Sequence, residues 1–228
     1  MTDIEGNVKR ITEYIKGEEV RLGRKIFLVG ATKTRTPEEI DAAVKAGLKA
    51  VGENRPQELR DKLPFFPPEA EIHFIGHLQK NKIKYVVGKV SLIHSCDSVE
   101  LAEAVSVYAA KCGIVQDMLL EVNISGEADK HGFSPDEICS AAEKIKNLNN
   151  VRFKGLMTVL PHIGEPLLSS YCIKAKEVYG KLKTEVFGSG FEILSMGMSE
   201  DYKTAIAFGS NMVRIGREIF GERDYGKN

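Results

Sequence analysis

The sequence has no excess of charge of either sign and no long hydrophobic run. Lysine plus arginine and aspartate plus glutamate each total 32, so no long-range field favours a nucleic acid or an anionic membrane. The first residues lack the apolar core of a secretion signal, and no later stretch has the apolar length of a membrane span. We therefore expect neither nucleic acid nor membrane as a partner, and a cytoplasmic location.

Cysteine is scarce and scattered. The four cysteines form no C-x-x-C pair, which argues against a zinc knuckle or a disulfide framework and predicts reduced, mostly buried thiols. Histidines 73, 94, 131 and 162 show no metal-ligand spacing either. We therefore expect no metal site.

No Ser/Pro-rich or low-complexity linker divides the 228 residues, which predicts a single domain. Short apolar runs alternate with amphipathic stretches, a rhythm typical of parallel strands joined by crossover helices. Eight strands are expected, at 26–32, 48–52, 72–76, 91–95, 118–124, 152–158, 192–196 and 211–215. This number favours a (β/α)₈ barrel of the TIM type over an open doubly wound sheet. We expect a helical extension over 1–24 with a helix around 8–15, the barrel over 25–221 and a tail over 222–228.

Polar residues fall at the predicted carboxyl ends of strands, where such barrels carry their chemistry: Lys33, Asn54, His77, Asn123 and Ser199. Phosphate commonly binds beside the last two strands of the barrel. There, Ser199 precedes an expected first helical turn at 200–203, and Gly216 permits close approach of the backbone. The pattern indicates a phosphate site next to Lys33.

Lys33 follows a buried strand, so its amine is expected to enter a pocket. A desolvated lysine can be nucleophilic near neutral pH and form an imine with a carbonyl. The simpler alternative is a lysine that extends to solvent. Arg214 could likewise pair with Glu121 or Glu53 as an ion pair inside the barrel.

Seven short strings occur in order along nearly the whole chain: VGATKT at 29–34, GEN at 52–54, HFIGHLQKNK at 73–82, VNIS at 122–125, GLMT at 155–158, LSMGMS at 194–199 and VRIG at 213–216. Together they resemble the pyridoxal phosphate homeostasis protein family. One departure precedes the lysine, where Gly30, Ala31 and Thr32 stand in place of the family's frequent alanine, valine and serine. The resemblance implies a barrel similar to the amino-terminal domain of alanine racemase, holding pyridoxal 5'-phosphate as an imine on Lys33.

The resemblance also assigns further residues to the cofactor. It makes Ser199, Gly216 and the adjoining backbone at Ile215 the phosphate clamp, with a wall shaped by Ser195, Met196 and Gly197. Arg214 would face the pyridine nitrogen, where a fixed cation disfavours protonation and makes the cofactor a poorer electron sink. Asn54, His77 and Met157 would line the ring. The loop 161–166 is assigned no contact.

The function implied is binding of pyridoxal phosphate for storage and delivery, without catalysis. The sequence stops soon after the eighth unit and leaves no residues for the second domain that supplies a base in the racemases. Apoenzymes that use the cofactor are the expected partners, and the protein is expected to be a monomer or a weak dimer. Two alternatives are open: a pyridoxal-phosphate-dependent racemase, and a class I aldolase whose lysine forms the imine with the substrate itself.

Overall fold

A computed structural model describes residues 2–222, which form a closed parallel barrel. Each strand pairs with the next along the chain, and β1 closes on β8. The strands are β1 Phe27–Ala31, β2 Ala50–Glu53, β3 Glu71–Phe74, β4 Leu92–Cys96, β5 Gln116–Glu121, β6 Val151–Met157, β7 Ile193–Ser195 and β8 Met212–Ile215. The predicted (β/α)₈ architecture and all eight predicted strands are confirmed. Of the predicted tail, only Glu222 belongs to the described residues.

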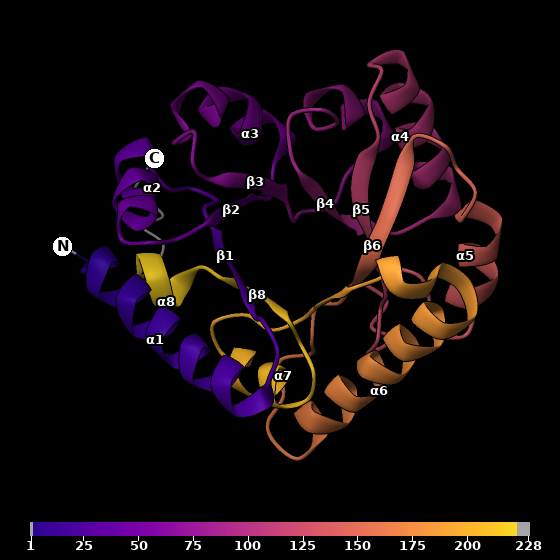
Figure 1. Cartoon of the computed structure of the whole chain (residues 1–228). Coiled ribbons are helices and arrows are strands. Elements are labelled where there is room, and N and C mark those ends of the chain that lie inside the picture. Colours follow the sequence, from indigo (N-terminus) through magenta and orange to yellow (C-terminus); the bar gives the residue numbers. More distant parts are fainter. Residues whose placement is uncertain (1, 223–228) are drawn as a thin grey trace.

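Helices form a ring around the strands (Figure 1). They are α1 Ile4–Leu22, α2 Pro37–Lys45, α3 Pro56–Lys62, α4 Val99–Lys111, α5 Ile138–Ile145, α6 Leu167–Leu182, α7 Tyr202–Ala207 and α8 Arg217–Phe220. Between β3 and β4 the chain forms a 3₁₀ helix, Lys80–Tyr85, in place of an α-helix. No helix within 2–222 is long and apolar enough to cross a membrane.

Local side-chain bonds set the ends of two helices. Helix α5 starts only at Ile138, because Ser134 and Glu137 form a turn in which each side chain accepts the other's backbone N–H. The predicted helix at 8–15 extends over Ile4–Leu22, since Asp3 accepts from Gly6 at its start and Gly23 ends it in the left-handed conformation.

Helix α1 covers one side of the barrel. Its residues Val8, Ile11 and Ile15 are buried in a cluster that also contains Ile40 of α2 and Phe220 of α8. Figure 1 shows α1 alongside these two helices. The extension therefore belongs to the same hydrophobic unit as the barrel.

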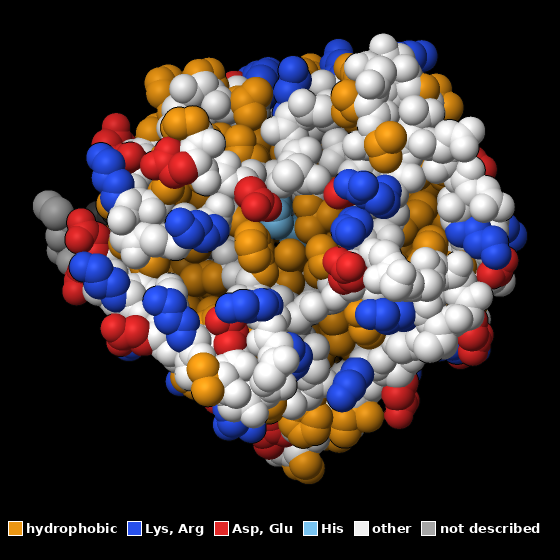
Figure 2. Space-filling view, in the orientation of Figure 1, with side chains coloured by type: hydrophobic (Ala, Val, Ile, Leu, Met, Phe, Trp, Pro, Cys, Tyr) orange, Lys and Arg blue, Asp and Glu red, His pale blue; other side chains and the backbone are white. Residues whose placement is uncertain are grey.

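The surface matches the balanced composition. Figure 2 shows acidic and basic side chains interspersed over one face, with hydrophobic side chains in its central hollow. The four thiols are less uniformly buried than predicted: Cys96 and Cys172 are buried and Cys139 half-buried, but Cys112 is exposed. Cys112 follows the last residue of α4.

Candidate functional site

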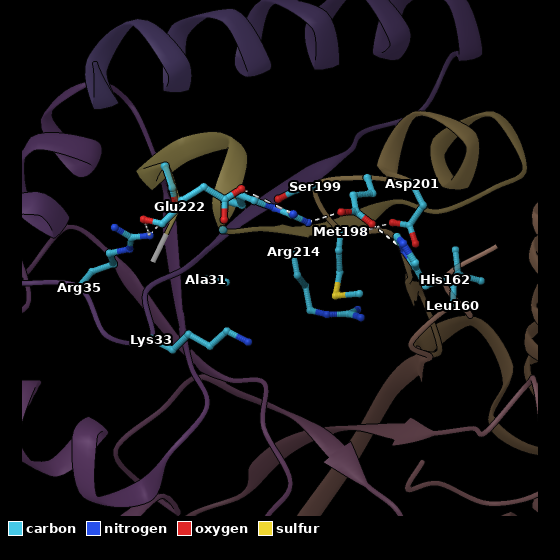
Figure 3. A pocket seen from close by; sticks show the side chains of 14 residues that line it. Ala31, Lys33, Arg35, Leu160, His162, Met198, Ser199, Asp201, Arg214 and Glu222 are labelled. Carbon is cyan, nitrogen blue, oxygen red and sulfur yellow. Dashed lines mark hydrogen bonds and ion pairs between the residues drawn. The ribbon is translucent and has the colours of Figure 1, made fainter. Parts of the chain in front are cut away.

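A cavity of about 470 Å³ opens at the carboxyl ends of β1 and β8. Four predicted site residues lie on its wall: Lys33, Ser199, Arg214 and Gly216. The Lys33 side chain, from the loop after β1, and the Arg214 side chain, from β8, extend into the same space (Figure 3). Folding therefore brings together an amine, a guanidinium and two turns that are far apart in the sequence.

The backbone on the amino-terminal side of Lys33 is held at three points. The Thr32 amide donates to the Gly52 carbonyl at 2.9 Å, and its hydroxyl donates to a Glu53 carboxylate oxygen at 2.7 Å. The Lys62 ammonium donates to the Thr32 carbonyl at 2.7 Å. These bonds fix the peptide that precedes Lys33 to β2 and α3.

The other side of Lys33 is held by the same acidic and basic side chains. Thr34 adopts a φ of +64°, and its amide donates to Glu58 at 2.5 Å. Lys62 bridges Glu58 at 2.6 Å and the fully buried Glu53 at 2.9 Å. Burial raises the pKa of Glu53, while its hydrogen bond to Thr32 and the charge of Lys62 oppose the shift. We call Glu53, Glu58 and Lys62 the β1 clamp.

Arg214 lies in the floor of the cavity and is only 4% exposed. One terminal nitrogen donates to the Ser195 carbonyl at 3.0 Å and to the Ser195 hydroxyl at 2.7 Å, and the other donates to the Thr158 carbonyl at 2.9 Å. Burial lowers the pKa of Arg214 to about 10, with the charges of Glu121 and Asp201 opposing the shift. The guanidinium is therefore still charged at neutral pH.

The alternative of an ion pair between Arg214 and a carboxylate is not what the structure shows within 2–222. Glu53 is bound by the Lys62 ammonium. Glu121 affects Arg214 only through its field, and one of its buried carboxylate oxygens has no hydrogen-bond partner among the described residues.

The turn after β7 differs from the prediction. Helix α7 begins at Tyr202, so Ser199 is not its cap, and Asp201 instead accepts from the Met198 amide at 2.5 Å. The Ser199 hydroxyl accepts from the Glu218 amide at 3.3 Å. Ser199 thus joins the β7 turn to the start of α8, which places its oxygen at the rim of the cavity.

Gly216 lies in a tight space beside β1. A Cβ at this position would lie 3.3 Å from the Ala31 Cβ and 3.4 Å from the Ala31 carbonyl oxygen. Gly197 is required for conformation as well, since its φ is +101° and a Cβ would meet Ala205 at 2.7 Å. The Gly197 carbonyl accepts the Arg214 amide at 3.0 Å and holds the two turns together.

The other predicted site residues do not line the cavity. Ser195 is buried and acts on the cavity through Arg214. Met196 and Ile215 pack in hydrophobic clusters, and Met157 packs with side chains from other strands. Asn54 lies outside the cavity, with its side-chain oxygen buried and without a hydrogen-bond partner among residues 2–222.

His77 lies apart from the cavity in a cluster that its sequence spacing does not reveal. Its Nδ1 is 2.9 Å from Asp97, and its ring is stacked on that of His131 with centroids 3.8 Å apart. The three side chains are close enough to hold a metal ion. However, the rings are parallel to within 10°, so their nitrogen lone pairs do not converge on one point. The arrangement is that of two stacked, exposed imidazole rings with a carboxylate beside one of them.

Several lining residues were not predicted. Arg35, Arg217 and His162 bring positive or titratable groups to the rim, and Leu160, Met198, Glu200, Asp201 and Glu222 complete the wall with Ala31 and Gly221. His162, in the loop that was assigned no contact, pairs with Glu200 at 2.7 Å. Arg35 and Arg217 each closely follow a predicted site residue, which is the one signal that could have identified them.

Comparison with known proteins identifies close sequence relatives of this chain. Residues 3–224 match the family described as alanine racemase, N-terminal domain. The pyridoxal phosphate homeostasis protein of Aquifex aeolicus is 42% identical over 96% of this chain and 97% of its own length. That of Escherichia coli is 33% identical over the full length of both.

Solved structures show the same fold. PipY of Synechococcus elongatus with PLP bound superposes with a TM-score of 0.84, at 26% identity over 96% of this chain and all of that one. An alanine racemase of Clostridium difficile has a TM-score of 0.76 at 16% identity, and this chain covers 56% of it. That likeness concerns the fold alone. The identity and coverage shared with the homeostasis proteins show that this chain belongs to the pyridoxal phosphate homeostasis protein family.

Proposed function

We propose that this protein binds pyridoxal 5'-phosphate in the cavity as an imine on Lys33. The observation that carries the proposal is the convergence of Lys33 and Arg214 on one cavity that Ser199 and Gly216 also line. In the condensation, the Lys33 amine attacks the aldehyde carbon and one water leaves. The PLP-bound structure of PipY supports the choice of ligand.

The cavity suits the chemistry of this ligand. Its volume of about 470 Å³ falls within the range of small-molecule sites. The Ser199 hydroxyl and the backbone at Gly216 are the proposed phosphate contacts, and Arg35 and Arg217 add positive charge at the rim. The missing Cβ of Gly216 leaves room for a phosphate oxygen beside Ala31.

We further propose that binding serves storage and delivery of the cofactor. Arg214 is a fixed cation in the cavity floor, and such a charge opposes protonation of a nearby pyridine nitrogen. An electron sink for carbanion chemistry requires the opposite, an acid at that nitrogen. The relatives' name, homeostasis protein, supports the same assignment. Recipient apoenzymes are the proposed partners, for a protein that is a monomer or a weak dimer.

Among the other predicted residues, four that do not line the cavity are proposed to support its wall from behind: Ser195, Met196, Gly197 and Ile215. Asn54 and Met157 keep a proposed place near the ring only through the resemblance. His77 is paired with Asp97 and is no longer proposed as a ring contact.

The test is an absorbance spectrum of the purified protein with added pyridoxal phosphate, followed by borohydride reduction and peptide mass spectrometry. We expect a yellow imine band and a reduced adduct on Lys33, both lost in Lys33→Ala. Lys25→Ala is the matched control, because Lys25 is 95% exposed and lines a different cavity. An adduct on another lysine, or none at saturation, would contradict the proposal.

The proposed absence of catalysis has its own test. The protein is incubated with single enantiomers of amino acids in the presence of the cofactor. We expect no racemisation beyond that of free pyridoxal phosphate, and steady racemisation in proportion to protein would instead favour the racemase alternative. A colourless protein that borohydride links to a sugar phosphate would favour the aldolase.

A further inference from the structure

Four buried polar side chains cross the inside of the barrel. They are His73 on β3, His94 on β4, Ser195 on β7 and Arg214 on β8, and each is at most 4% exposed. Arg214 reaches the Ser195 hydroxyl at 2.7 Å, Ser195 lies 3.4 Å from His94 Nδ1, and His94 Nε2 lies 3.1 Å from His73 Nδ1. Side chains of four strands thus form one line of hydrogen bonds.

The line ends at the opposite face of the barrel. His73 Nε2 lies 3.5 Å from a carboxylate oxygen of Glu71, whose side chain is 57% exposed. Both residues line a second cavity of about 560 Å³, formed where several strands begin. One end of the line is therefore in the proposed cofactor cavity, and the other is at the amino ends of the strands.

The carboxylate end gives every bond in the line its direction when the two imidazoles are neutral. A carboxylate can only accept, so His73 then carries its proton on Nε2, facing Glu71. His73 Nδ1 accepts from His94 Nε2. His94 Nδ1 in turn accepts from the Ser195 hydroxyl, whose oxygen accepts from the Arg214 guanidinium. Both neutral rings are then in the same tautomer.

The surroundings favour this state. Burial is the largest cause that lowers the pKa of His94 well below its usual value, so this ring is neutral at pH 7. The ring of His73 is held against Phe27, with the two planes 10° apart and centroids 6.0 Å apart. Neither imidazole can rotate without leaving a buried nitrogen unpaired, and an unpaired buried polar group is costly.

We propose that Ser195, His94 and His73 are positioning residues that hold the Arg214 guanidinium through a one-directional hydrogen-bond chain ending at Glu71. The chain supplies neutral acceptors, so it orients the cation without cancelling its charge. A carboxylate in the place of Ser195 would neutralise the group instead. The part of this inference that concerns the cofactor rests on the function proposed above, whereas the hydrogen-bond chain itself does not.

The hydrogen-bond chain is tested without any ligand by ¹⁵N NMR of the imidazole rings. The protein has five histidines, so the spectrum is sparse, and His73→Gln and His94→Asn assign the two signals. We expect both rings at pH 7 to show a protonated Nε2 and an unprotonated Nδ1. A charged ring, or a proton on Nδ1 of either residue, would refute the chain.

The positioning role is tested by the affinity for pyridoxal phosphate and the pH titration of its absorbance. In His94→Phe, the Ser195 proton has no acceptor, and we expect the dissociation constant to rise roughly tenfold and the titration to shift. His94→Asn, whose side-chain oxygen can replace Nδ1, should stay within about threefold of wild type. His131→Phe is the control, because His131 is exposed and takes no part in the hydrogen-bond chain.

The outcomes separate the two proposals. If His94→Phe binds and titrates like wild type, positioning is refuted; if it does not fold, Ser195→Ala removes the same link with a smaller change and is measured in the same way. If the wild type binds no pyridoxal phosphate, the proposed function fails, yet the tautomers measured by NMR still decide whether the chain exists.

Discussion

At Gly216, limited space and not an unusual backbone conformation favours glycine. Its φ is −113°, which any residue adopts, but a Cβ would lie 3.3 Å from Ala31 on the wall of the cavity. We expect Gly216→Ala to change the free energy of unfolding by less than about 1 kcal/mol and to weaken binding of pyridoxal phosphate roughly tenfold. Thermal melting and fluorescence titration would measure the two effects.

Gly17→Ala is the matched control, because a Cβ at Gly17 of α1 would meet no atom within 4 Å. We expect a gain in stability of about 0.5 to 1 kcal/mol and unchanged affinity. Equal affinities of the two variants would remove Gly216 from the proposed phosphate site.

A second prediction at the scale of the residue concerns the charge of Arg214. In Arg214→Gln, the cation is lost, so the bound cofactor's ring nitrogen should protonate at a higher pH than in wild type. Absorbance recorded across a pH series would show the shift. Arg217→Gln changes a cation at the exposed rim that pairs with Glu200, and should leave this titration in place. Identical titrations of Arg214→Gln and wild type would place the ring nitrogen away from Arg214.

At the scale of the element, the β1 clamp joins the ends of β1 and β2 to α3. Lys62→Met would leave the fully buried Glu53 without its cationic partner, and we expect a loss of about 3 to 5 kcal/mol in the free energy of unfolding. Adding Glu53→Gln to the Lys62→Met variant should recover part of this loss, because the buried side chain at position 53 is then neutral. Urea denaturation would measure both.

An exposed ion pair provides the comparison for the clamp. Lys45 and Asp41 are 2.7 Å apart on α2, with Lys45 70% exposed. Lys45→Met should cost less than about 1 kcal/mol. If Lys62→Met cost no more than Lys45→Met, the clamp would not stabilise the end of β1.

The sequence predicted elements better than their ends. The first β/α unit was predictable, because Thr36 and Glu39 form the reciprocal cap and Pro37 occupies the first helical turn. The start of α7 was not, because Asp201 accepts from the Met198 amide and delays the helix to Tyr202. A local side-chain bond of this kind competes with helix formation and leaves no periodic signal.

At the scale of the whole molecule, the buried Glu121 makes stability depend on pH. Burial, with a smaller contribution from Asp97, raises the pKa of Glu121 to about 7, while Arg214 opposes the shift. Between the pKa of the unfolded chain, about 4.5, and 7, the folded state binds the proton more tightly. The contribution of Glu121 to the free energy of unfolding is therefore fully present below a pH of about 4.5, and it is lost as the pH rises through 7.

We expect Glu121→Gln to reduce this fall and to be more stable than wild type at pH 8, by up to roughly 3 kcal/mol. Urea unfolding of the ligand-free protein at pH 5 and pH 8 would measure it. Glu192→Gln removes a 63% exposed carboxylate and is the control for loss of a charge. Parallel pH profiles of wild type and Glu121→Gln would contradict the argument.

The sequence by itself determined the eight alternating units, hence the barrel, and it pointed to Lys33, Ser199 and Gly216, because strand periodicity and turn residues are local signals. Arg214 was assigned to the same site only through the resemblance to a family. Only the tertiary structure decided that His77 pairs with Asp97 away from the cavity, and that His94 and Ser195 stand behind Arg214. These contacts join residues that are distant in the sequence, and nothing in residue spacing encodes which side chains meet once the barrel closes.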